Sequence, residues 1–376
     1  MKYLTDVAAG LGLYLHIPFC IKKCAYCDFY SGTAEEKAIE AYTERLSEEI
    51  MKWGGRLCRP CVDTIYLGGG TPSLLEDRLV PLLDAARTAF LLDDGAEVTM
   101  ELNPAPNVSK ALSAAVTAGI NRLSIGAQSG NDSELALLGR SHTAADTLAA
   151  VRTARRYGFD NISLDLMIGL PDSSVKTLEK SLDFILSAQP EHISAYILKL
   201  EENTLLYNKR GIINLPEDDE TAEQYLYMCR RLESAGYEHY EISNFCLPGR
   251  ESRHNLKYWR CEEYLGIGPS AHSFIDGKRF YYPRDIKAFK AGVLPVQDGG
   301  GGGAEEYIML RLRLAEGLCF EVMRRRFGIS SENMVKAALP LKEAGLLRVM
   351  DKKISLTDKG MLVSNSIITE LLENCT

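Results

Sequence analysis

Short apolar, β-rich runs alternate with amphipathic stretches over the first half of the chain. The runs cover residues 13–17, 64–67, 97–102, 122–126, 162–168 and 192–198. Between them apolar residues recur every three or four positions, as at Ile39, Tyr42 and Leu46, which is the spacing of one helix face. Strands that alternate with helices of this length predict βαβ crossovers and a parallel sheet. Six such units fit either an open doubly wound sheet or a partial (β/α) barrel.

The ends of the predicted strands carry polar or glycine-rich sequences. HIPFC, GGGTPS, ELNP, GAQS and GLPD each close or follow one of the runs. Both candidate architectures collect their chemistry at the carboxyl ends of parallel strands. The pattern therefore predicts one site, surrounded by a ring of loops.

The alternation stops near residue 200, which indicates a change of organisation. One further helix is predicted at 217–235, and five glycines at 299–303 predict a flexible linker. Beyond the linker we expect three helices and a β-hairpin, at 304–315, 321–327, 332–344 and in LLRVMDKKISLT. The chain is thus expected to form a barrel with an extension at about 200–298, together spanning 1–298, and a small winged-helix-like domain at 304–376.

Charge and hydropathy narrow the class of protein. The 376 residues carry a formal net charge of −8, which argues against a broad electropositive surface, so we expect no nucleic-acid partner. No apolar run approaches the roughly 18 residues of a membrane-spanning helix. The N-terminal MKYLTDVAAGLGLYL contains Asp6 and leads straight into a cysteine motif, so we interpret it as part of a mature cytoplasmic protein.

Three cysteines follow the first predicted strand with the spacing C-x3-C-x2-C: Cys20, Cys24 and Cys27. Structural zinc usually takes four ligands, and no fourth stands nearby. An iron–sulfur cubane on three thiolates instead leaves one iron open, and the amino and carboxylate groups of S-adenosylmethionine can chelate it. Zinc completed by a distant residue, or three free thiols, remains the alternative. The isolated pair Cys58 and Cys61 carries no assignment.

Other loops supply groups that suit such a cofactor. GGGTPS lets the backbone approach a ligand closely, because glycine has no side chain in the way. Glu101 is placed to bridge ribose hydroxyls, and the planar fork of Arg140 matches the methionine carboxylate. Gln128 and Asp165 stand near the ends of later strands.

The ordered set YLHIPFCIKKCAYCDF, LGGGTPS, ELNP, RLSIGAQS, LGRSH, DLMIGLP and HISAYIL, within residues 12–280, resembles the radical S-adenosylmethionine superfamily. Within it, the chain is similar to the oxygen-independent coproporphyrinogen III oxidase family. The resemblance implies an α/β fold with a partial (β/α)6 barrel and an electron donor for the cluster. It implies a 4Fe-4S cluster on Cys20, Cys24 and Cys27, and S-adenosylmethionine contacts from Tyr14, Gly69, Gly70, Thr71, Glu101, Gln128, Arg140 and Asp165.

Two departures separate the chain from that oxidase. The oxidase has a further cysteine two residues past the third, where this chain has Phe29, and it has an N-terminal extension for which this chain leaves no room. The chain instead resembles the branch of heme chaperones called HemW, which shares the CDF ending and the motif written here RHNLKYW.

This second resemblance implies a protein that binds heme and delivers it to heme proteins such as respiratory enzymes, and it allows a homodimer. His254 is the candidate axial ligand of heme iron, with a purely structural histidine as the alternative. No residue is assigned a catalytic role. The competing functions are a radical enzyme acting on a porphyrinogen and a radical S-adenosylmethionine methyltransferase.

Overall fold

The computed structural model describes residues 10–374. Residues 1–9 and 375–376 are outside this part, so Asp6, on which the interpretation of the N-terminus depends, lies outside the described residues. Among the helices of residues 10–374, none is both long and apolar enough to cross a membrane.

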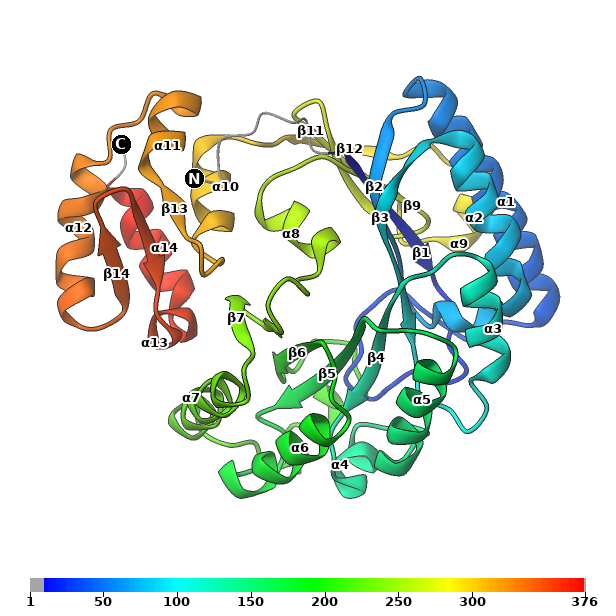
Figure 1. Ribbon diagram of the computed structural model, residues 1–376, viewed down its shortest axis with the longest axis horizontal. Coiled ribbons are helices and arrows are strands. Elements are labelled where there is room, and N and C mark those ends of the chain that lie inside the picture. The colour runs from blue at the N-terminus through cyan, green and yellow to red at the C-terminus, as the bar shows by residue number, and fades with distance from the viewer. Residues whose placement is uncertain (1–9, 375–376) are drawn as a thin grey trace.

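Six parallel strands form the centre of a single large sheet, in their order along the chain (Figure 1). They are β1 (Leu11–Ile17), β2 (Cys61–Gly69), β3 (Leu91–Leu102), β4 (Arg122–Gln128), β5 (Ile162–Ile168) and β6 (His192–Ile197). Each contains most or all of one run predicted from the sequence. The sheet curves but does not close, so the predicted partial (β/α)6 barrel is confirmed.

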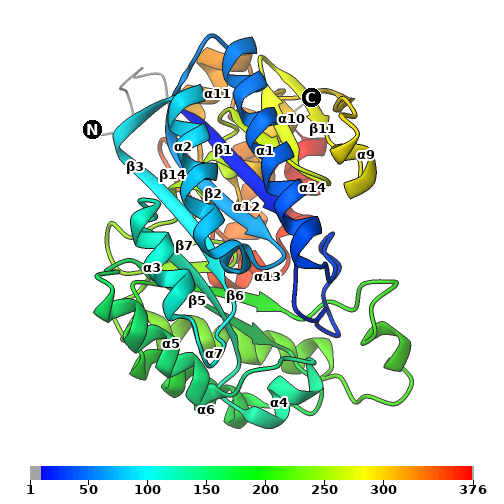
Figure 2. The same cartoon turned by 90° about the vertical axis from the view of Figure 1, so that its right-hand side faces the viewer.

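Helices cover the convex side of these strands, as Figures 1 and 2 show. They are α1 (Glu36–Arg56), the 3-10 helix η1 (Pro72–Arg78), α2 (Leu79–Ala89), α3 (Ser109–Thr117), α4 (Asp132–Leu137), α5 (Ala144–Arg156) and α6 (Val175–Ser187). The predicted apolar face of α1 is buried, with Tyr42 and Leu46 completely covered. Both α5 and α6 begin with a capping box, in which Thr143 and Ser174 accept the backbone N–H three residues on.

Short strands extend the sheet at both edges, and they were not predicted. On the β1 side lie β9 (Tyr264–Ile267), β10 (His272–Ile275), β11 (Lys278–Tyr281) and β12 (Val296–Gly300); on the β6 side lie β8 (Asn244–Cys246) and β7 (Glu238–Glu241). The connecting helices are η2 (Tyr207–Lys209), α7 (Asp218–Ser234), α8 (Arg253–Trp259) and α9 (Ile286–Lys290). Gly299 and Gly300 belong to β12, where Gly300 pairs with Lys278, so the first two glycines of the predicted linker are strand.

A smaller lobe follows the glycines (Figure 1). It contains α10 (Ala304–Arg311), β13 (Leu318–Cys319), α11 (Phe320–Phe327), α12 (Glu332–Glu343), β14 (Leu347–Met350), β15 (Lys353–Leu356), α13 (Asp358–Leu362) and α14 (Ser364–Glu373). The predicted helices are present, and the predicted hairpin forms β14 and β15 of a three-stranded antiparallel sheet completed by β13. Backbone hydrogen bonds of 3.0 Å from Ile242 N–H to the carbonyl of Arg313 and 2.9 Å from Ala315 N–H to the carbonyl of Tyr240 join the lobe to β7 and the turn after it.

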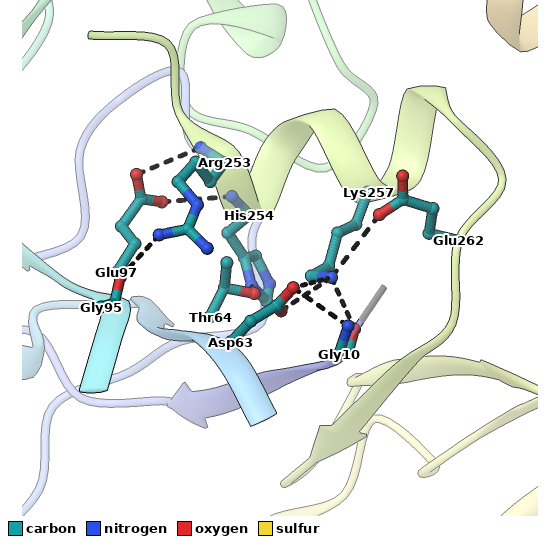
Figure 3. A network of polar contacts seen from close by, with 9 residues as sticks. All are labelled: Gly10, Asp63, Thr64, Gly95, Glu97, Arg253, His254, Lys257 and Glu262. Atoms are coloured by element: carbon teal, nitrogen blue, oxygen red, sulfur yellow. Dashed lines mark hydrogen bonds and ion pairs between the residues drawn. The ribbon is translucent and has the colours of Figure 1, made fainter. Parts of the chain in front are cut away.

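Helix α8 fills part of the concave side of the sheet, and a polar network fastens it there (Figure 3). The Glu97 carboxylate on β3 accepts the backbone N–H groups of Arg253 and His254, both at 3.1 Å, at the first turn of the helix. Lys257, 2% exposed, donates to the backbone carbonyl of Gly10 at 2.6 Å and pairs with Asp63 at 2.7 Å. This helix therefore blocks one end of the concave side and leaves the carboxyl ends of the strands accessible.

Candidate functional site

A cavity of about 540 Å³ opens at the carboxyl ends of the barrel strands. Its walls come from the cysteine loop after β1, the glycine turn after β2, and the ends of β3 to β6. The predicted convergence on one site is confirmed for HIPFC, GGGTPS, ELNP and GAQS, each of which contributes residues to this cavity, whereas GLPD does not line it and β5 contributes Asp165 and Met167 instead.

The three cysteines lie on a loop held in place by backbone hydrogen bonds. The N–H of Cys20 donates to the carbonyl of Gly32 at 2.9 Å, and the N–H of Ala25 donates to the carbonyl of Leu138 at 2.9 Å. All three thiols are partly exposed and line the cavity, and within residues 10–374 no other cysteine does. The donor set is therefore three converging thiols on an ordered loop.

Arg140 connects this loop to the barrel. Its Nη1 donates to Sγ of Cys24 at 3.3 Å, while its Nη2 donates to Oδ1 of Asn103 and to the carbonyl of Gly126, both at 2.7 Å. Three acceptors from three segments fix the planar guanidinium at the wall of the cavity. A positive charge therefore lies directly beside Sγ of Cys24.

The glycine turn after β2 brings the backbone against the cysteine loop. A Cβ on Gly69 would stand 2.4 Å from Cε1 of His16, and the φ of Gly69 is +111°, a conformation that side chains disfavour. A Cβ on Gly70 would stand 2.5 Å from the carbonyl oxygen of Phe19. The N–H of Gly70 donates to the carbonyl of Ile17 at 2.8 Å, which holds the turn close to this segment. Glycine is therefore required at both positions.

Two carboxyl groups lie in the cavity wall with raised pKa values. Burial, followed by the charge of Asp165, raises the pKa of Glu101 to about 7, although its two oxygens accept from the N–H of Gly69 at 3.0 Å and from the hydroxyl of Tyr66 at 3.1 Å. Burial likewise raises the pKa of Asp165 to about 6, against a 3.2 Å bond from Ser124. Both carboxyls are oriented acceptors for a ligand's donors.

Most of the predicted cofactor residues meet at this cavity. Those lining it are Cys20, Cys24, Cys27, Gly69, Gly70, Glu101, Gln128, Arg140 and Asp165. Thr71 and Tyr14 do not line it. The Thr71 hydroxyl donates to Sγ of Cys20 at 3.7 Å, and the Tyr14 hydroxyl is hydrogen-bonded to Nδ1 of His16 at 3.0 Å, so both support lining elements from behind.

Several wall residues were missed by the sequence reasoning. Tyr66, Asn103, Ser124 and Tyr196 all line the cavity. Asn103 stands two residues after Glu101 in ELNP, and the others are polar or aromatic residues inside apolar strands. A polar side chain at an inward position of a barrel strand is the signal that could have identified them.

His254, the predicted axial ligand of heme iron, lies away from the cavity and is not among the residues that line it. The side chain is fully buried, its Nδ1 is hydrogen-bonded to Oγ1 of Thr64 at 2.8 Å, and its Nε2 to the hydroxyl of Tyr258 at 2.8 Å. Both ring nitrogens are therefore engaged within the protein, which is the arrangement of a structural histidine. Figure 3 shows it on the first turn of α8, with its ring directed toward Thr64 of β2.

Cys58 and Cys61 are exposed and lie where β2 begins, opposite the cavity. They take no part in the site.

Comparisons with known proteins agree with this geometry. Residues 14–185 match the family model of the radical SAM superfamily, and residues 304–363 match that of the HemN C-terminal domain. "Heme chaperone HemW" of Bacillus subtilis is 36% identical over 96% of this chain and 98% of its own. A protein of Danio rerio, "Radical S-adenosyl methionine domain-containing protein 1, mitochondrial", is 33% identical over 93% and 80% of the two chains.

The solved structure of coproporphyrinogen III oxidase (HemN) from Escherichia coli superposes with a TM-score of 0.83. It covers 97% of this chain and 90% of its own at 23% identity, which establishes a shared fold. The bacterial HemW relatives are 36% identical over 96% of this chain, which is a closer similarity than that to the oxidase. The chain therefore belongs to the HemW family of the radical SAM superfamily.

Proposed function

We propose that the protein is a heme chaperone that carries a 4Fe-4S cluster and S-adenosylmethionine, binds heme and delivers it to heme proteins. The relatives named HemW, which match nearly the whole chain, supply the activity in their name. The proposal extends to cytoplasmic location, acceptors among respiratory enzymes, an electron donor for the cluster, and a homodimer.

The residues of the cavity fit the two cofactors that radical SAM membership implies. Cys20, Cys24 and Cys27 would hold the cluster, and three thiolates leave one iron open. Arg140 and Glu101 would orient the methionine carboxylate and the ribose. When bound, the cluster supplies an electron that can cleave the sulfonium of S-adenosylmethionine.

The observation that carries the heme assignment is the rim of the cavity. Phe29, at the position where the oxidase family has a fourth cysteine, is 69% exposed, and Ile197 is 44% exposed. Lys22 and Lys23 line the same rim. Exposed apolar side chains beside cations suit a flat apolar macrocycle with two carboxylates, which is the chemistry of heme.

The test is an anaerobic heme titration of cluster-loaded protein with S-adenosylmethionine present, followed in the Soret region. We expect saturable binding, weakened about tenfold or more in Phe29→Ser and in the pair Lys22→Glu with Lys23→Glu, because each removes roughly 1.5 kcal/mol or more of contact energy. Leu339→Ser, an exposed apolar residue on α12, is the matched control and should bind like the parent. If the rim variants bound heme as tightly as the parent, the rim would not be the heme-binding site.

Two measurements then distinguish a heme chaperone from a radical enzyme. A chaperone transfers its heme to a heme-free cytochrome, whereas an oxidase forms 5′-deoxyadenosine in proportion to the coproporphyrinogen III it consumes. His254→Gln should leave the heme spectrum unchanged, because both ring nitrogens are engaged within the protein. A lost axial-ligand signature in that variant would restore His254 as the heme ligand.

A further inference from the structure

A second group of metal-ligand side chains lies far from the cavity, where the barrel extension meets the C-terminal lobe. Cys229 on α7, His239 on β7 and Asp358 on α13 each offer one ligand atom, and these atoms lie within 4.8 Å of one another. His239 and Asp358 are 119 positions apart in the sequence, yet their side chains are hydrogen-bonded. The fold alone brings them together.

The spacing suits a tetrahedral ion. Bonds of about 2.0–2.3 Å at tetrahedral angles place ligand atoms roughly 3.3–3.8 Å from one another. Nδ1 of His239 and Oδ1 of Asp358 are 3.1 Å apart, and the whole set needs to contract by no more than about 1 Å to reach these values. Side-chain rotation alone provides such a movement.

The imidazole of His239 is held in position, with its Nδ1 facing Asp358. Its ring stacks on Phe245 with centroids 4.2 Å apart and planes at 14°, and Tyr225 packs edge-on against it at 6.2 Å. Its Nε2 is buried and has no hydrogen-bond partner. Nδ1 is the nitrogen that would bind an ion shared with Asp358, with the imidazole proton on Nε2.

The donor types select the metal. A thiol and an imidazole together favour zinc over magnesium or calcium, which prefer oxygen ligands. Burial, followed by the charge of Asp358, raises the pKa of Cys229 to about 12, so the free group is a neutral thiol rather than a nucleophilic thiolate. Binding zinc would release that proton to solvent, and the resulting thiolate and carboxylate would balance the two positive charges.

We propose that Cys229, His239 and Asp358 bind one zinc ion, with water as the fourth ligand, and that this ion fastens the C-terminal lobe to the barrel extension. The site would reinforce the backbone hydrogen bonds that already join β7 and the turn after it to residues 313–315. It is independent of the heme proposal, since it lies on elements that do not line the cavity.

The experiment uses the cluster-loaded full chain, so that the thiols of Cys20, Cys24 and Cys27 are occupied. After equilibration with zinc and removal of the unbound ion, elemental analysis should find about one zinc per chain beside the cluster iron, and the zinc X-ray absorption should show one sulfur at about 2.3 Å with nitrogen and oxygen at about 2.0–2.2 Å. Cys229→Ser and His239→Ala should lose this zinc. Cys246→Ser, a buried cysteine of neighbouring β8, is the matched control and should keep it.

Asp358→Asn keeps the test decisive should the buried variants fail to fold, because Asp358 is only partly buried. It should weaken zinc binding at least about tenfold, and chelation should speed proteolysis near the glycines before α10. No bound zinc above the buffer blank, a zinc without sulfur, or unchanged affinity in Asp358→Asn would overturn the proposal.

Discussion

The guanidinium of Arg140 donates a hydrogen bond to Sγ of Cys24 at 3.3 Å, although 116 residues separate the two. The same group holds the carbonyl of Gly126 at the end of β4. One side chain thus sets the distance between the cysteine loop and the barrel wall. The thiols and the strand-end polar groups act as a single site because of this connection.

Arg140→Lys should weaken S-adenosylmethionine binding and leave most of the cluster in place. Lysine keeps the charge but cannot reach Cys24, Asn103 and Gly126 together, so at least one charged hydrogen bond of about 1.5–3 kcal/mol is lost. We expect roughly 10–100-fold weaker binding by equilibrium dialysis. Arg152→Lys, on the exposed face of α5, is the control. Equal affinities in the two variants would contradict a role for the fork.

Gly69→Ala should disrupt the glycine turn. The added Cβ meets the ring of His16 at 2.4 Å and the backbone has φ +111°, so we expect a loss of roughly 2–4 kcal/mol in the free energy of unfolding, together with loss of S-adenosylmethionine binding. Gly55→Ala in α1 is the matched control, since nothing lies within 4 Å of its Cβ position; it should stabilise by up to about 1 kcal/mol. Urea unfolding measures both changes, and a Gly69 variant as stable as the parent would refute the close-contact argument.

The sequence predicts the barrel strands well because apolar residues stand at every second position or closer, as in ISLDLMI of β5, which is buried on both faces apart from the partly exposed Asp165. It misses β9 to β12, which have four or five residues each and extend outward from the edge of β1, where β9 pairs with β1 itself. Local pattern cannot specify elements that depend on a partner strand more than 200 residues away.

The residues of the candidate site likewise fall into those that the sequence identifies and those that it does not. Short, dense motifs identify the three cysteines and the glycine turn, because their chemistry is local. Tyr14 and His254 carry equally suggestive contexts, yet their neighbours in space, His16, Thr64 and Tyr258, engage their polar atoms in structural bonds. Which way a polar side chain faces in a curved sheet depends on packing that the sequence does not display.

The ion pair between buried Lys257 and partly buried Asp63 should be required to hold α8 on the concave side of the sheet. Lys257→Met leaves Asp63 and the Gly10 carbonyl without their cation, which should cost about 3–5 kcal/mol in the free energy of unfolding. Adding Asp63→Leu should recover part of the loss, since it removes the uncompensated carboxylate. Lys287→Met, exposed on α9, should change stability little. A Lys257 variant that matches this control would show that the pair contributes nothing.

Stability should fall on the acid side because of His254. Burial, followed by the charge of Lys257, lowers the pKa of His254 from 6.5 to about 3. Below about pH 6.5 the unfolded chain takes up a proton that the folded protein refuses, so the free energy of unfolding decreases as the pH falls, by roughly 2 kcal/mol at about pH 5 from this residue alone. Above pH 6.5 both states are neutral and the dependence ends.

His254→Gln should remove that part of the pH dependence, whatever its effect on stability at neutral pH. Tyr258→Phe is the matched control, because it deletes the hydrogen bond to Nε2 but keeps the buried imidazole, and its acid-side slope should persist. Urea unfolding at several pH values between about 5 and 8 compares the slopes directly. If the Gln variant retained the slope of the parent, His254 would have to be accessible to protons in the folded state, and the buried, doubly hydrogen-bonded imidazole of α8 would not describe the protein in solution.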